Sequence, residues 1–95
     1  MPHPPTQSAV HLHIRGRVQG VGFRFFAQDA AQELGLSGWV RNAPDGSVEA
    51  YGEGRRQDLE AWIERLRQGP TLARVEAITP SWKTPQAHSQ TFSIR

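Results

Sequence analysis

The spacing of apolar residues changes several times along this chain, and the order of these changes constrains the fold more than any other feature. Residues 10–18, VHLHIRGRV, are apolar at alternate positions, which is typical of a half-buried strand. Residues 23–34, FRFFAQDAAQEL, instead carry one apolar stripe with the spacing of a helix. Gly35 follows as a left-handed C-cap, so a strand and then a helix are predicted here.

A hairpin is predicted in the middle of the chain. Residues 36–42 form a short strand, and residues 42–47, NAPDGS, contain the Pro and the Asp-Gly pair of a tight turn. Residues 47–52 are expected to return as the second strand of the hairpin. We expect inward-facing side chains at Val48 and Ala50 and outward-facing side chains at Ser47, Glu49 and Tyr51.

A second helix and two further strands complete the pattern. The helix is predicted over residues 55–69, where Gly69 ends it. A strand is predicted over residues 74–82, with a bulge or an end at Pro80, and a short strand is predicted over residues 90–95. The inward-facing side chains expected in these three elements are Leu59, Trp62, Ile63, Leu66, Val75, Ala77, Thr79, Phe92 and Ile94.

The resulting order is β-α-β-β-α-β with a short terminal strand, which predicts one α+β domain with the ferredoxin-like sandwich fold. Because each helix has one apolar stripe, both helices are expected to pack on the same face of an antiparallel sheet and to leave the other face wet. The 95 residues suffice for one small domain, which we place at residues 9–95. The Pro-rich, polar residues 1–8 are predicted to be a flexible tail.

Composition narrows the classes of function. The chain has no cysteine, which excludes disulfides, thiolate metal sites and a cysteine nucleophile. Neither a secretory signal nor an apolar run long enough for a bilayer is found, so a cytoplasmic location without a membrane partner is expected. The formal net charge of +2 suits an anionic small molecule and is too weak to indicate nucleic acid. His11 and His13 share one strand face and are interpreted as solvated residues, because a zinc site would need a third ligand.

The loop between the first strand and the first helix, RVQGVG at residues 17–22, predicts an anion-binding site. The first N–H groups of a helix lack internal partners, and no Ser, Thr, Asp or Asn is available here to cap them. Gly20 and Gly22 let the backbone curl, so that several N–H groups and the helix dipole meet at one point. Arg24, in the first turn, can bind a phosphate there with two N–H groups. The alternative is a plain strand-to-helix connection in which the glycines supply only steric room.

Two motifs of this sequence resemble those of the acylphosphatase family. The first is GRVQGVGFR at residues 16–24, and the second is GWVRNAPDGSVEAYGEG at residues 38–54. The similarity extends over residues 10–95, where GPTLARVE at residues 69–76 also fits the family's usual passage into its fourth strand. The resemblance implies the ferredoxin-like fold that the periodicity predicts independently.

The resemblance also implies a reaction and the residues that carry it. Members of the family hydrolyse acyl phosphates to a carboxylate and inorganic phosphate, without a metal, another cofactor or a covalent intermediate. Their catalytic arginine and asparagine fall on Arg24 and Asn42, although the residues alone favour a turn role for Asn42, since it precedes Pro-Asp-Gly. The family's phosphate-binding loop falls on Val18, Gln19, Gly20, Val21, Gly22 and Phe23.

The chemistry of these residues agrees with the implied reaction. Phosphoryl transfer depends mainly on positioning and charge stabilisation, which Arg24 and the loop amides can supply. A carboxylate needs little help from a general acid in order to leave, and the Asn42 amide can hold a water in line with the leaving oxygen. The expected partner is therefore a small acyl phosphate, and the expected oligomeric state is a monomer.

Two other functions are compatible with the predicted fold. RNA-recognition domains have the same order of elements, but they stack bases on aromatic residues of their central strands. Here the outer face of the first strand carries His11, His13 and Arg15, and Tyr51 is the aromatic residue expected on the third. The other alternative is a non-catalytic or fused-domain relative of the family, with a regulatory role in which phosphate binds and no substrate is turned over.

Overall fold

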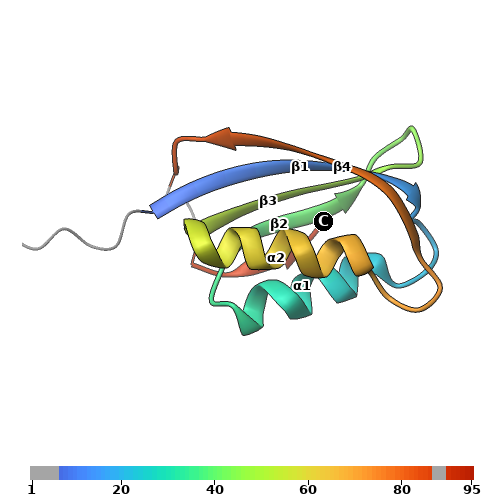
Figure 1. Cartoon of the computed structure of the whole chain (residues 1–95), viewed down its shortest axis with the longest axis horizontal. Coiled ribbons are helices and arrows are strands. Elements are labelled where there is room, and N and C mark those ends of the chain that lie inside the picture. Colours follow the sequence, from blue (N-terminus) through green and yellow to red (C-terminus); the bar gives the residue numbers. More distant parts are fainter. Residues whose placement is uncertain (1–6, 87–89) are drawn as a thin grey trace, which may run out of the picture.

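The computed structural model describes residues 7–86 and 90–95, and its elements follow the predicted order (Figure 1). Gln7 and Ser8, the last two residues of the predicted tail, already belong to the first strand, and residues 1–6 lie outside the described residues. The elements are β1 (Gln7–Arg17), α1 (Phe23–Glu33), β2 (Ser37–Asn42), β3 (Val48–Arg55), α2 (Arg56–Gln68), β4 (Arg74–Lys83) and β5 (Phe92–Ile94).

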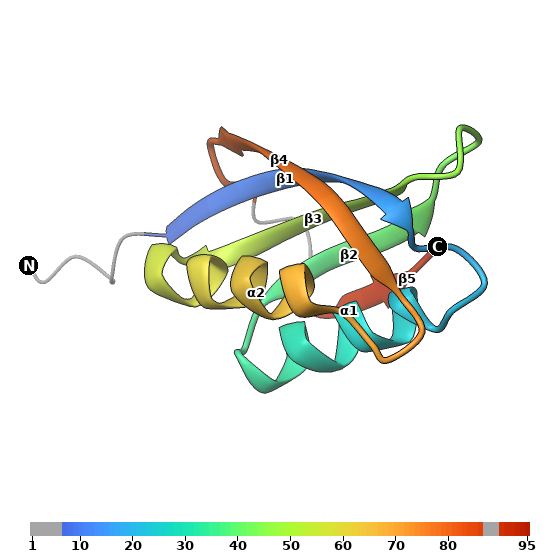
Figure 2. The same ribbon diagram turned by 45° about the vertical axis from the view of Figure 1, so that its right-hand side comes forward.

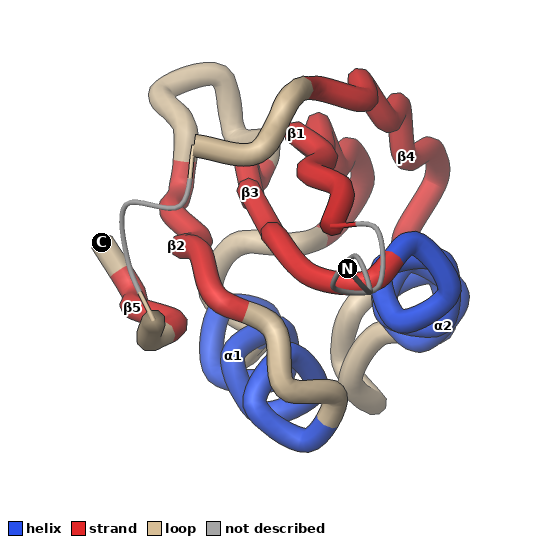
Figure 3. Tube along the Cα trace, turned by 90° about the vertical axis from the view of Figure 1, so that its left-hand side faces the viewer, coloured by secondary structure: helices blue, strands red, loops and turns tan. Residues whose placement is uncertain are grey.

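The strands form one sheet in the order β4-β1-β3-β2-β5. Figure 3 shows β4 beside β1 at one edge and β5 beside β2 at the other. The predicted ferredoxin-like fold is confirmed with one correction, because β5 pairs parallel with β2 and the sheet is therefore mixed rather than wholly antiparallel. The cause is the direction of β4: it is antiparallel to β1 and ends where β2 begins, so the chain enters β5 in the direction of β2.

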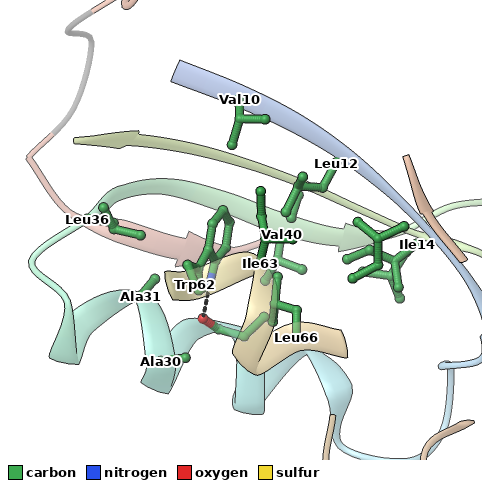
Figure 4. Packing of buried hydrophobic residues seen from close by; sticks show 14 of the residues in the cluster. Val10, Leu12, Ile14, Ala30, Ala31, Leu36, Val40, Trp62, Ile63 and Leu66 are labelled. Carbon is green, nitrogen blue, oxygen red and sulfur yellow. Dashed lines mark hydrogen bonds between the residues drawn. The ribbon is translucent and has the colours of Figure 1, made fainter. Parts of the chain in front are cut away.

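Both helices cover one face of the sheet, as predicted, and the core lies between the two layers (Figure 1). The α2 stripe of Leu59, Trp62, Ile63 and Leu66 is buried against the sheet. Figure 4 shows Trp62 at the centre of this core, where its Nε1–H donates a hydrogen bond of 3.1 Å to the carbonyl of Ala27 in α1. This contact ties the two helices together across an otherwise apolar layer.

The C-terminus of α1 is closed by the predicted glycine. Gly35 has a φ of 71°, in the left-handed region that a side chain disfavours. Its N–H donates to the carbonyl of Gln32 at 3.1 Å, and the N–H of Leu36 donates to the carbonyl of Ala31 at 2.9 Å. This pair of bonds is a Schellman motif, which satisfies the last carbonyls of the helix.

A bulge changes the pattern of burial along β4. Arg15 pairs with Ala77 and Gly16 pairs with Val75, so Glu76 is an extra residue in β4. The alternation therefore changes phase, and Ile78 faces the core where the sequence pattern predicts Thr79. Pro80 neither ends the strand nor makes the bulge, because β4 continues to Lys83 along the edge of the sheet. In the described part of the chain, no helix is long and apolar enough to cross a membrane.

Candidate active site

The loop between β1 and α1 lies at the same end of the sheet as the β2–β3 turn and the end of β5 (Figure 2). Gly22 is the N-cap of α1 and has a φ of 79°, and no side chain caps this helix. Gly20 is also left-handed, with a φ of 75°. The first turn contains no acidic residue, so the positive end of the helix dipole is not compensated locally. The predicted uncapped helix start is confirmed, and its chemistry suits an anion.

The apolar residues of this loop anchor it and leave its backbone free. Val18 and Phe23 are each 1% exposed and belong to the core, and Val21 packs partly against the core. Gly20 and Gly22 are exposed. The side chains of the three apolar residues therefore point into the core and leave the backbone groups of Gly20 and Gly22 at the surface.

Arg24 is directed towards the end of β5. Its Nη1 donates a hydrogen bond of 3.3 Å to the backbone carbonyl of Arg95. The N–H of Arg95 in turn donates to the carbonyl of Val40 in β2 at 2.9 Å. The predicted catalytic arginine is thus connected, through one residue, to the strand that ends at Asn42.

Asn42 is placed by the register of the hairpin. It pairs with Val48, whose side chain is fully buried in the core. Because paired residues of an antiparallel ladder point to the same face, the Asn42 side chain lies on the helix side of the sheet, towards which α1 packs. Its Oδ1 is buried and has no hydrogen-bond partner among the described residues. An unsatisfied amide oxygen at this position can accept a hydrogen bond from a small ligand or a water.

A third side chain, Gln19, joins the loop to the hairpin turn. Its Nε2 donates to the carbonyls of Ala43 and Ser47 at 2.8 and 2.9 Å. From the sequence, Gln19 is predicted only to contribute a backbone amide to the loop, so its side-chain contact with the turn is not predicted. The single signal in the sequence is a long side chain with two donors at the centre of a glycine-rich loop, and it does not name the acceptors.

The turn itself is held by a small polar cluster. Ser47 is predicted to face outward, but it is only 3% exposed, because its Oγ donates to Asp45 Oδ1 at 2.5 Å and lies 2.9 Å from His13 Nε2. The N–H of Ser47 also donates to Asp45 Oδ1 at 2.9 Å. These hydrogen bonds from Ser47 hold the pKa of Asp45 below its usual value. His13 thus has a hydrogen-bonding role, and the described residues contain no group of three or more His, Cys, Asp or Glu suited to a metal ion.

The outer face of the sheet carries a stacked aromatic pair next to Asn42. The rings of Trp39 and Tyr51 stack with their centroids 6.1 Å apart, and the Arg95 guanidinium lies 4.7 Å from the Trp39 ring centroid. The Tyr51 hydroxyl donates to Glu53, and burial together with this neighbouring carboxylate raises the pKa of Tyr51 to about 12. Burial also lowers the pKa of His11, whose ring packs against Trp39 in a T-shaped arrangement. A pocket at this end of the sheet is lined by His11, Trp39, Arg41, Asn42, Glu49 and Arg95.

Taken together, the fold and this end of the sheet define a ferredoxin-like α+β domain with an anion-receptive helix start. The acylphosphatase family model matches residues 10–94. An acylphosphatase from Thermus thermophilus is 56% identical over 69 residues, which are 73% of this chain and 78% of the relative. The chain therefore belongs to the acylphosphatase family.

Solved structures agree with this assignment. The crystal structure of the acylphosphatase from Bacillus subtilis superimposes with a TM-score of 0.90 and 35% identity, over 93% of this chain and 98% of that one. A full-length HypF structure in its phosphate- and nucleotide-bound form matches 100% of this chain with 12% of its own length, at a TM-score of 0.90 and 30% identity. The predicted class of enzyme, a hydrolase of the acylphosphatase type, is confirmed, and the family and the fold support acyl phosphate hydrolysis.

Proposed function

We propose that this chain hydrolyses acyl phosphates to a carboxylate and inorganic phosphate, using the end of the sheet described above. In this proposal the backbone amides of residues 18–23 and the Arg24 guanidinium bind the phosphate, and Asn42 holds the attacking water. The observation that carries the proposal is the buried, unpartnered Oδ1 of Asn42, in a strand linked to Arg24 through Arg95.

The binding half of the proposal rests on the start of α1. Each free N–H of the first helical turn is a donor, and the left-handed Gly20 and Gly22 keep the approach to them open. Arg24 adds a fixed positive charge with a planar set of donors, which matches the oxygens of a phosphoryl group. The negative charge that develops on these oxygens during transfer is stabilised by the same groups.

The hydrolytic half rests on Asn42. Its Oδ1 accepts a hydrogen bond from a water and so directs a lone pair of that water at the phosphorus. The new bond forms between the water oxygen and phosphorus, and the bond between phosphorus and the acyl oxygen breaks, with the electron pair leaving on the carboxylate. The proton of the water passes to a phosphate oxygen. A carboxylate leaving group makes a separate general acid unnecessary, so the residues named here complete the chemistry without a metal or another cofactor.

The remaining features of the proposal concern partners and location. We place the enzyme in the cytoplasm as a monomer that acts on small acyl phosphates rather than on nucleic acid. The aromatic rings of the outer face do not form a free platform for bases, because Trp39 and Tyr51 stack on each other and Arg95 lies over Trp39.

The test is hydrolysis of benzoyl phosphate by the purified protein in the presence of EDTA. Arg24→Ala removes the charged donor and is expected to lower kcat/KM by about 10²–10³-fold, as for loss of an oxyanion-hole donor. Asn42→Ala is expected to lower kcat while the inhibition constant of inorganic phosphate stays within about twofold. Arg65→Ala is a matched control, because within residues 7–86 and 90–95 the Arg65 side chain makes a surface ion pair with Glu33 at 2.9 Å.

Two results would contradict the proposal. Full activity in Arg24→Ala would remove the guanidinium from the mechanism. Phosphate binding that depends on Arg24, in a wild-type protein with no hydrolysis above background, would instead indicate a regulatory phosphate-binding domain.

A further inference from the structure

We infer that the Gln19 side chain is a positioning residue, which sets the place of Asn42 relative to the phosphate-binding loop. The inference rests on the proposed function, because it assigns a role within that site. Its basis is the contact between Gln19 and the two ends of the β2–β3 turn.

The geometry uses every donor that the Gln19 amide has. Nε2 carries two hydrogens, and they go to the carbonyls of Ala43 and Ser47 at 2.8 and 2.9 Å. These two residues close the turn by a backbone bond of 2.9 Å from the Ala43 N–H to the Ser47 carbonyl. A single side chain therefore holds both ends of the β2–β3 turn. No donor of this amide remains for a phosphate.

The hydrogen bond from Gln19 to Ala43 lies one residue from Asn42. Ala43 follows Asn42 directly, and the Asn42 Oδ1 has no hydrogen bond within the described chain that would fix it independently. Among the described residues, the two Gln19 bonds are the hydrogen bonds that join residues 18–22 to residues 42–47. We therefore infer that Gln19 adjusts the distance between the bound phosphate and the Asn42 amide, in addition to the sheet register that places Asn42 in β2.

The turn behaves as one unit in this arrangement. Asp45 Oδ1 accepts from both the N–H and the Oγ of Ser47, and Ser47 Oγ contacts His13 Nε2 in β1. Loss of the Gln19 bonds leaves this network and its contact with β1 intact, and removes the side-chain link between the turn and residues 18–22. Asn42, which directly precedes the turn, can then shift relative to the helix start and Arg24.

This division predicts a split between the kinetic constants. Gln19→Met keeps the length of the side chain and removes both donors. A displacement of about 1 Å in a positioned group costs about 10²-fold, so kcat for benzoyl phosphate is expected to fall about 10- to 100-fold. The inhibition constant of inorganic phosphate is expected to stay within about twofold, because the groups that bind phosphate are untouched.

The matched control is Gln28→Met. Gln28 also donates from Nε2 to a backbone carbonyl, that of Phe92, at 3.0 Å, so this variant loses a comparable structural bond elsewhere. It is expected to lose similar stability and to keep kcat. An unchanged kcat in Gln19→Met would overturn the inference, and so would equal losses of kcat in the two variants. An inhibition constant for phosphate that rises in step with the loss of kcat would assign the Gln19 side chain to phosphate binding instead.

A measurement on the wild-type protein covers the case in which Gln19→Met does not fold. Hydrogen exchange of the Gln19 side-chain amide, followed by NMR, is expected to be slower than that of the exposed Gln68 side chain. Equal exchange rates would contradict the hydrogen bonds from Gln19 to the turn. This measurement also separates the two proposals. If the wild-type protein does not hydrolyse benzoyl phosphate but its Gln19 amide is protected, the proposed function is contradicted while the contact between Gln19 and the turn is retained.

Discussion

Substitution of Gly22 by alanine tests whether the start of α1 is shaped for a ligand or only for the helix. Gly22 is the N-cap and has a φ of 79°. A Cβ built there would meet no atom within 4 Å, so steric overlap adds nothing. The cost of the substitution therefore comes from the left-handed backbone alone.

The magnitude follows from that conformation. A side chain in the left-handed region costs roughly 1–2 kcal/mol, and alanine restricts the unfolded chain, which offsets about 0.4–1 kcal/mol of this loss. A net loss of about 1 kcal/mol in the free energy of unfolding is expected, and for a domain of this size it lowers Tm by about 4–8 °C.

Gly35 supplies a control on the same helix. It lies at the other end of α1 with a φ of 71°, and a Cβ there also meets no atom within 4 Å. Gly35→Ala is therefore expected to lose the same stability as Gly22→Ala. The two variants should differ in activity, because relaxation at Gly22 moves N–H groups that we place against the phosphate. A fall of about 10- to 100-fold in kcat/KM is expected for Gly22→Ala alone.

The assay combines urea unfolding with hydrolysis of benzoyl phosphate and a thermal shift on adding inorganic phosphate. In the wild type and in Gly35→Ala, saturating phosphate should raise Tm, since it binds only the folded state. In Gly22→Ala this rise should shrink. The reasoning is refuted if Gly22→Ala matches Gly35→Ala in activity and in the response to phosphate.

Two further predictions concern the core and the outer face. Trp62→Phe opens a cavity and removes the hydrogen bond to Ala27, so the free energy of unfolding should fall by about 2 kcal/mol. Urea unfolding measures this loss, and an unchanged urea midpoint would contradict the packing of Trp62. Tyr51 is the single tyrosine, and its ultraviolet titration should have a midpoint near pH 12 in the folded protein and about 10 in denaturant. Because the folded phenol keeps its proton where the unfolded phenol loses it, the unfolding free energy should fall as the pH rises above about 10. A folded-state midpoint near 10 would argue against the Tyr51–Glu53 contact.

Much of the fold follows from local pattern. In α1, α2, β1 and β5, the spacing of the apolar residues is enough to predict which side chains face the core. The structure buries Leu12, Trp62 and Phe92 as expected. The pattern fails where a long-range contact changes it. Ile78 replaces Thr79 in the core because Glu76 is an extra residue in the pairing of β4 with β1. The sequence of β4 does not indicate this bulge, since the bulge depends on the register with β1. The parallel direction of β5 likewise depends on where β4 ends and leaves no trace in residues 90–95.

The candidate site divides in the same way. Gly20, Gly22 and the missing cap are neighbours in the sequence, so the anion-receptive helix start can be predicted from the chain alone. Asn42 cannot be placed on the helix side of the sheet without its register against Val48. The contact of Gln19 with the turn joins residues far apart in the chain, so it becomes visible only in the fold.

The pairing of β5 with β2 also has a consequence for the order in which the parts of this site form during folding. Gly38 pairs with Phe92, so more than half of the chain lies between the two partners. Closing so long a loop costs conformational entropy before the contacts of β5 can form. The start of α1 needs only its sequence neighbours and can form early. The carbonyl of Arg95 that accepts the Arg24 bond arrives with β5. We therefore expect the anion-receptive helix start to form in a refolding chain before the carbonyl of Arg95 reaches Arg24.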